Sequence, residues 1–182
     1  GGVWWWQTQP DFEPADLSKF AYELPDKPSI AVLPFDNLSS DPTQDYIGDG
    51  LTENIISVLS TSPNIMVIAR NSSFTFKDKA VKVQEVAEQL GVRYVLEGSI
   101  QQSGETLRVT AQLVDAVDGK HIWSERYDRK LDDLFALQDD ITDQISQAMQ
   151  VELVFGDQAR DFQEHTGSPE EIRLLTQGRA AF

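Results

Sequence analysis

Three carboxylates on one predicted helix are the first candidates for chemistry. Asp45, Asp49 and Glu53 recur every four residues, so a helix would place them on one face. Such a row could bind a divalent cation, or supply a general acid and a general base. In a chain with 30 Asp and Glu residues, however, rows of this kind also arise as ordinary solvated helix faces. We interpret this row as solvated surface and expect no metal site there.

The remaining motifs do not complete a reactive centre. The two histidines, His121 and His165, lie far apart, and neither an HExxH motif nor a Cys/His cluster accompanies them. The chain contains no cysteine, which excludes a thiolate nucleophile and a disulfide. No G-x-S-x-G or Walker A sequence occurs, and the glycines at Gly48 and Gly50 lack the third glycine of a dinucleotide fingerprint. We therefore expect no catalytic residue and no cofactor in this chain.

A polar stretch that follows a predicted strand is the better candidate for a binding site. The apolar run 65–69 predicts a buried strand, and Arg70, Asn71, Ser72 and Ser73 come directly after it. In open α/β sheets, ligands bind just beyond the carboxyl ends of the strands. Asn and Ser at a strand exit can also simply cap the next turn. We retain these four residues as candidates for binding a ligand or a partner.

The elements that would position this stretch run strand, helix, strand. The apolar run 30–33 predicts a strand covered on both faces. Strand, helix and strand in this order imply a parallel pair with a right-handed crossover. Gly48 and Gly50 weaken the first turns of the helix, so we expect an irregular start or one nearer Thr52. The apolar stripe of the helix comprises Ile47, Leu51, Ile55, Val58 and Leu59.

The second half of the chain predicts an antiparallel meander. Its expected elements are a helix over 83–90, strands over 92–99, 107–114 and 121–127, and a long helix over 131–154. Gly91 stands where a left-handed residue ends the first of these helices. The polar residues 101–105 predict the loop of a hairpin. The fold class is therefore α/β: a mixed sheet of about five strands, parallel in its first half and antiparallel in its second, packed with two to three helices.

Both ends of the chain predict attachment to further parts. Trp4, Trp5 and Trp6 are typical of the water edge of a membrane-spanning helix, and we expect an anchor just before Gly1. A strand or tail that packs its indoles onto the core is the less favoured alternative. Ser168 opens a capping box, and the helix after it is similar to the first helix of a tetratricopeptide repeat. We expect a post-membrane linker over 1–28, one α/β domain over 29–155, and a linker with the start of a repeat-like helix over 156–182.

Five blocks of sequence resemble one known family. In order, they are IAVLPF, YIGDGLTE, IARNSSF, LGVRYVLEGS and DAVDGKHIWSERYDR. Over about residues 29–151 they resemble the domain that is similar to the N-terminal domain of TolB. This domain occurs between a transmembrane helix and tetratricopeptide repeats in bacterial adenylate/guanylate cyclases and membrane-bound winged-helix regulators. The resemblance implies a TolB N-terminal, anticodon-binding-like fold.

The resemblance also implies a role in signalling. It implies a non-catalytic sensor or protein-interaction domain on the periplasmic, extracytoplasmic side of the bacterial inner membrane. It favours a class III nucleotide cyclase over a winged-helix regulator as the output of the parent chain, and a scaffold beside tetratricopeptide repeats is the further alternative. The partner would be a protein or a small-molecule signal, and a homodimer is left open.

Charge narrows the choice of partner. The formal net charge of −15 makes this chain a poor ligand for nucleic acid and for an anionic membrane surface, because both need a basic face. Lys77, Lys79 and Lys82 form a basic cluster within this acidic chain. They could receive an acidic partner segment, although a solvated loop would explain them equally.

Overall fold

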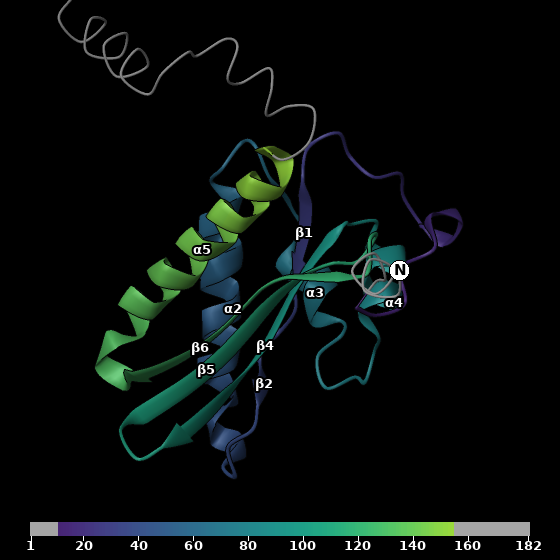
Figure 1. Ribbon diagram of the computed structural model, residues 1–182. Coiled ribbons are helices and arrows are strands. Elements are labelled where there is room, and N and C mark those ends of the chain that lie inside the picture. The colour runs from purple at the N-terminus through teal and green to yellow at the C-terminus, as the bar shows by residue number, and fades with distance from the viewer. Residues whose placement is uncertain (1–10, 155–182) are drawn as a thin grey trace, which may run out of the picture. The chain divides into compact units, whose positions relative to one another are not determined.

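The computed structural model describes residues 11–154 (Figure 1). The predictions on Trp4–Trp6 and on the repeat-like helix after Ser168 lie outside these residues. By its internal contacts the chain divides into two units, Gly1–Ile145 and Ser146–Phe182, and the division falls within the last described helix. The description below concerns the first unit.

Within residues 11–154 the fold is a mixed sheet of six strands, which confirms the α/β class and adds one strand to the five or so predicted (Figure 1). The strand order is β3-β1-β4-β5-β6, and β2 pairs with β4 beyond the end of β1. β1 is parallel to β3 and β4, whereas β4, β5 and β6 form the antiparallel meander. The strands are β1 (Ser29–Val32), β2 (Asp36–Asn37), β3 (Met66–Val67), β4 (Tyr94–Ser103), β5 (Thr106–Asp115) and β6 (Lys120–Lys130). The prediction of a buried strand over 65–69 was wrong in one respect: β3 is a half-buried edge strand of two residues.

The first long helix, α2 (Asp45–Ser60), begins earlier than its glycines suggested. A 3-10 turn precedes it, and Asp41 Oδ1 caps that turn by accepting a hydrogen bond from the Thr43 N–H at 2.9 Å. A Cβ on Gly48 would lie 2.8 Å from the Phe35 carbonyl oxygen, so this glycine allows α2 to approach the segment between β1 and β2 closely. Val58, which we placed on the apolar stripe, is 43% exposed, and Ile56 is buried in its place.

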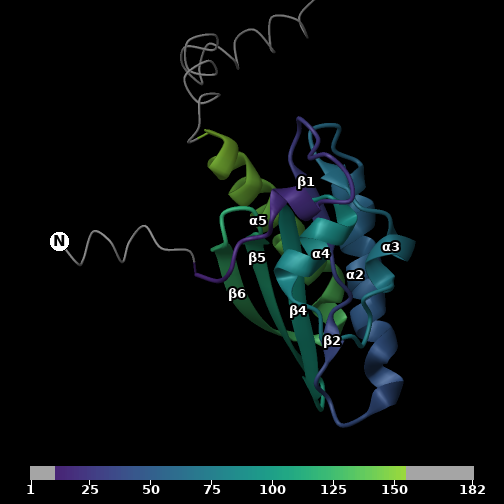
Figure 2. The ribbon, with the colours of Figure 1, turned by 90° about the vertical axis from the view of Figure 1, so that its right-hand side faces the viewer.

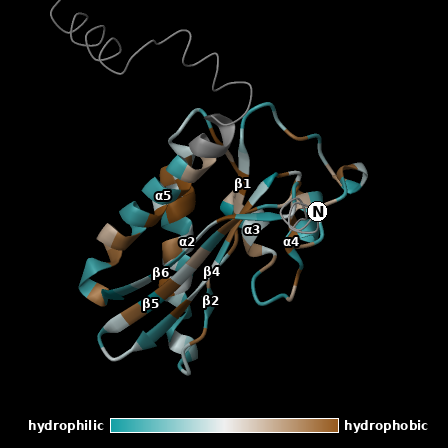
Figure 3. Cartoon of the chain, viewed as in Figure 1, coloured by the Kyte–Doolittle hydropathy of each residue, from teal (hydrophilic) through white to brown (hydrophobic). Residues whose placement is uncertain are grey.

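Successive residues of β4 point to opposite faces of the sheet, so the contacts of Ile100 and Val95 show which helices cover each face. Gly48 of α2 lies close to Ile100, and α5 (Leu134–Val154) reaches the same face through the 2.9 Å ion pair between Asp140 and Arg129. We call this the helix face. Val95, which points the other way, belongs to the core cluster under α4 (Val83–Leu90). Figure 2 shows α4 in front of β4, and Figure 3 shows hydrophobic and hydrophilic residues alternating along α5.

The connection between β4 and β5 is tighter than predicted. The ladder continues to the pair Ser103–Thr106, so the turn contains only Gly104 and Glu105 rather than the whole stretch 101–105. Gly104 has a φ of +61°, which glycine adopts at little cost. The prediction failed because Gln101 and Gln102 are polar strand residues rather than loop residues. Gly91, by contrast, ends α4 in the left-handed conformation as predicted, with a φ of +71°.

The segment before β1 lies along the domain, and we call residues 11–28 the strap. The N–H groups of Asp11 and Phe12 donate to the Gly119 carbonyl at 2.7 and 3.1 Å, and the Ala15 N–H donates to Ala116 at 2.8 Å. Ala15 is buried and belongs to the core cluster under α4. The strap is therefore hydrogen-bonded to the turn between β5 and β6 and packed onto the core.

Candidate functional site

The four predicted binding residues lie in a short helix, α3 (Arg70–Phe74), and not in a loop. Arg70 forms an ion pair with Glu53 of α2, and its guanidinium lies 4.1 Å from the centroid of the Phe74 ring. Asn71 and Ser72 are exposed. Ser73 is fully buried, and its hydroxyl has no hydrogen-bond partner among the described residues. The structure therefore brings Arg70 and Asn71 together at the surface and places Ser73 in the interior, and a binding role for these residues stays a prediction.

The three carboxylates of α2 are each held by a different side chain. Asp45 accepts a hydrogen bond from the Asn37 amide at 2.7 Å. Asp49 accepts from Lys77 at 2.5 Å, and this bond raises the pKa of the lysine. Glu53 pairs with Arg70. Within residues 11–154 no group of three or more His, Asp or Glu side chains converges on one point. The row thus connects α2 to its neighbours.

A groove lies on the sheet face opposite α2 and α5. Three adjoining cavities of about 400, 480 and 340 Å³ all have Glu97 of β4 in their lining. The register explains the floor, because Glu97 lies opposite Gln112 and Ser99 opposite Thr110, all four on one face of the sheet. The Gln112 amide donates a hydrogen bond to the Glu97 carboxylate. We call this hollow the Glu97 groove.

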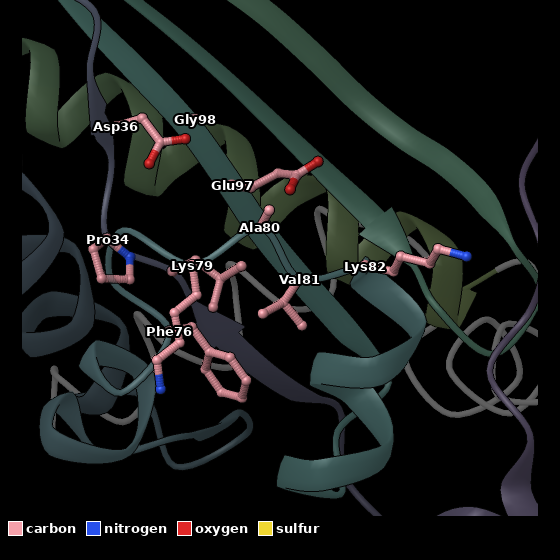
Figure 4. Close-up of a pocket in the computed structure, with 10 residues that line it drawn as sticks. Pro34, Asp36, Phe76, Lys79, Ala80, Val81, Lys82, Glu97 and Gly98 are labelled. Carbon is pink, nitrogen blue, oxygen red and sulfur yellow. The ribbon is translucent and has the colours of Figure 1, made fainter.

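The walls of the Glu97 groove come from the loop before α4 and from the strap. Figure 4 shows Asp36 and Glu97 on one side of its first cavity and Phe76 and Val81 on the other. The second cavity extends the hollow between Phe12 of the strap and His121, whose rings make an edge contact at 5.5 Å between centroids. The groove is consequently apolar along its walls and polar on its floor.

The charges around the Glu97 groove are of both signs. Lys79 and Lys82, from the predicted basic cluster, line it, and within residues 11–154 neither forms an ion pair. Burial, followed by the nearby Asp78 carboxylate, raises the pKa of Asp36 at one end of the groove. Lys77 instead faces the acids of α2. The cluster is therefore divided, and only its last two lysines border the groove.

Sequence reasoning did not locate the Glu97 groove, although a signal for it was present. Glu97 and Ser99 are polar residues between the buried Leu96 and Ile100 on β4, and Thr110 and Gln112 alternate with buried residues on β5. Polar residues on one side of two paired strands indicate a solvated face. What the sequence does not reveal is that the strap and the loop before α4 rise beside this face.

A family model matches residues 26–154, which is most of the chain. Its description is HilA/YgeH-like transcriptional regulator, second domain. The chain belongs to this family. The family describes a domain of a regulator rather than a catalytic domain, and the match spans the whole sheet with α2 to α5.

Relatives of this HilA/YgeH-like domain agree with that assignment. A protein named "Putative adenylate cyclase 3" from Rhizobium meliloti (strain 1021) is 49% identical over 159 residues, which is 87% of this chain and 27% of that protein. The chain thus spans about a quarter of the length of this relative. Among solved structures, TolB from Acinetobacter baumannii matches 71% of this chain and 30% of its own, with 21% identity and a TM-score of 0.51. The lipoprotein GNA1162 from Neisseria meningitidis matches 66% of this chain and 99% of its own, with 23% identity and a TM-score of 0.49.

The likeness to TolB confirms the TolB-like fold that the five sequence blocks predicted. The domain is thus an accessory domain by family, and it resembles part of a protein that carries the name of a cyclase. None of the helices within residues 11–154 is both long enough and apolar enough to cross a membrane.

Proposed function

We propose that this domain is a non-catalytic sensor or protein-interaction domain, held on the extracytoplasmic side of the inner membrane, in a parent chain that is a class III nucleotide cyclase. The observation that carries the proposal is the 49% identity with about a quarter of the protein named as an adenylate cyclase. A domain that occupies a quarter of such a protein leaves room for a separate catalytic domain. The extracytoplasmic location rests on the sequence resemblance to domains that follow a transmembrane helix.

The way the polar side chains are used supports a binding role. The α2 carboxylates, which had the best spacing for chemistry, are engaged with Asn37, Lys77 and Arg70. The Glu97 groove, by contrast, is open and combines an apolar wall with a polar floor. Binding sites for small molecules and peptides share this mixture. We assign the signal or the partner to this groove, with the exposed Arg70 and Asn71 as a second contact.

The strap gives the groove a route to the membrane side. Phe12 and Glu13 line the second cavity of the groove, and in sequence they lie between the groove and the anchor that we expect before Gly1. Occupation of the groove would change the contacts of Phe12 and so the position of the strap. A signal can pass in this way only if the strap has two arrangements that the ligand distinguishes.

The proposal is tested in the full-length parent protein by blocking the groove. Ala80 is exposed and lines the groove, so Ala80→Arg should fill it without disturbing the core. Ser57→Arg, at an exposed position of α2, adds the same charge elsewhere. We expect Ala80→Arg to change the rate of cyclic nucleotide formation in membranes several-fold and Ser57→Arg to leave it unchanged.

The outcomes separate the two parts of the proposal. Equal rates for the two variants would remove the groove from the mechanism while leaving a cyclase parent intact. Failure of the wild-type parent to convert ATP or GTP to a cyclic nucleotide would remove the cyclase. A fusion of alkaline phosphatase to Phe182 tests the location separately, because the enzyme is active only outside the cytoplasm, and an inactive fusion would contradict it.

The family description favours one second candidate, a membrane-bound winged-helix transcriptional regulator as parent. In that case the parent would bind DNA through another domain. A gel-shift assay with the parent protein and promoter fragments distinguishes the two, because a cyclase domain would not retard DNA.

A further inference from the structure

The outer edge of the sheet carries an inference beyond the proposed function. Within the described sheet β6 pairs only with β5, so its other edge presents backbone groups that have no strand partner. The first part of this edge is occupied, because Asp11 of the strap accepts a hydrogen bond from the His121 N–H at 2.9 Å. A register shift at Leu113/Val114 interrupts the ladder at the same place. Regular pairing resumes at Trp123 and continues to the end of the strand.

The charged residues of this regular stretch are divided between the two faces. Arg126 and Asp128 lie on the open face, where Asp128 accepts a hydrogen bond from Arg108 of β5 at 2.8 Å. Glu125, Tyr127 and Arg129 lie on the helix face. The helix face of this stretch therefore carries one acid and one base, four residues apart. The open face carries Arg126 and Asp128, two residues apart, with Lys130 at the end of the strand.

We propose that a second copy of this chain pairs with β6 in antiparallel orientation, with a two-fold axis through Tyr127. A two-fold axis perpendicular to the sheet places the helix faces of both copies on the same side. Residues that lie opposite each other in the new strand pair must then belong to the same face. The axis must therefore pass through a residue and not between two residues. An axis at Tyr127 places Arg126 opposite Asp128 of the second copy and Glu125 opposite Arg129 of the second copy.

The neighbouring registers are disfavoured by charge or by geometry. An axis through Glu125 or through Arg126 would place two like charges directly opposite each other, which destabilises a strand pair. An axis through Ser124 would run the second copy across the register shift and the Asp11 contact. Among these registers, only the one at Tyr127 makes four opposite-charge contacts, two on each face.

The same charges explain why the partner would be another copy and not any strand. Charged residues on an edge strand normally prevent association, because an arbitrary partner leaves them unmatched. Here they match only a strand that carries the complementary order of charges, and β6 itself carries it. The net charge of −15 opposes association at long range, but at physiological ionic strength it is screened beyond about 8 Å. We therefore expect a weak dimer.

The test is a pair of charge reversals in the 182-residue chain. In a dimer of the Arg126→Glu variant, the new carboxylate lies opposite Asp128 of the second copy at both symmetry-related positions. In a dimer of the Asp128→Lys variant, the new ammonium group lies opposite Arg126 at both positions. Sedimentation equilibrium from about 1 µM to about 1 mM covers weak association. We expect the wild-type chain to dimerise in this range and each variant alone to dimerise at least about tenfold more weakly. A mixture of the two variants should recover the wild-type affinity, because the new Glu and Lys then face each other.

The control is Lys120→Glu, which changes the net charge as Arg126→Glu does but lies in the occupied part of the edge. It should dimerise like the wild type, and circular dichroism melts should show that all variants fold. A wild-type chain that stays monomeric throughout the range would overturn the proposal. A dimer that is unaffected by Arg126→Glu, or variants that fail to associate when mixed, would overturn it as well.

Discussion

Phe20 of the strap decides whether residues 11–28 are a tether or part of the folded domain. The Phe20 ring is half-buried against the core cluster under α4, and the neighbouring Ala21 N–H donates to the Glu88 carbonyl at 2.9 Å. Truncation of a fully buried phenylalanine costs about 3 to 5 kcal/mol, so Phe20→Ser should cost roughly half of that, about 2 kcal/mol. In a domain of this size, that corresponds to a fall in Tm of about 4 to 8 °C.

Tyr22 provides the matched control two residues further along. Tyr22 is 69% exposed, and it approaches Gly91 with its Cβ, which serine retains, and with one edge of its ring. Tyr22→Ser should therefore change the free energy of unfolding by less than about 0.5 kcal/mol. Urea unfolding of both variants measures the difference. If both leave stability unchanged, the strap contributes nothing to the fold, and the argument that it transmits a signal from the groove fails with it.

Three further variants test the interior. Gly98→Ala would place a Cβ 2.2 Å from the Thr110 carbonyl oxygen, and we expect a loss of about 3 kcal/mol in urea unfolding. Burial, followed by the Glu125 carboxylate, raises the pKa of Tyr127 to about 12. The unfolded chain loses this proton from about pH 10, so stability should fall by about 2 kcal/mol between pH 10 and pH 12 in the wild type, and Tyr127→Phe should lack this component. Asp115→Ala should cost about 3 kcal/mol by thermal unfolding, because the buried carboxylate holds Arg93 and two N–H groups, and a loss below 1 kcal/mol would contradict this account.

The order and type of the main elements could be predicted from local pattern alone. The apolar run at 30–33 and the alternation in 107–114 have no other simple interpretation, and α4 with its Gly91 cap follows directly from helical spacing. The division of the sheet into a parallel and an antiparallel half could be predicted from the connections between its strands. A helix separates the first strands, whereas short turns connect the later ones. These features depend on residues close together in the sequence.

The errors came from contacts between distant residues. Gly48 looked like a weak point of α2, but it is required by the approach of the Phe35 carbonyl, which no local pattern shows. Val58 fits the apolar stripe by spacing, yet it is 43% exposed, and the neighbouring Ile56 is buried instead. Arg70–Ser73 were expected at an exit loop, but they lie in α3, whose first residue, Arg70, pairs with Glu53 of α2.

The Glu97 groove follows from a mismatch of lengths. The ten residues of β4 extend over about 33 Å, whereas the eight residues of α4 extend over about 12 Å. A helix this short cannot cover the strand it packs on, so roughly two thirds of that face must be solvated or bound to something else. The uncovered part of this face carries the polar residues Glu97 and Ser99, as contact with water requires. Yet it also places the half-buried Phe12, Phe76 and Val81 beside them, where solvation alone would favour polar residues. That combination of a polar floor and apolar walls is the strongest structural argument for a binding partner at this face.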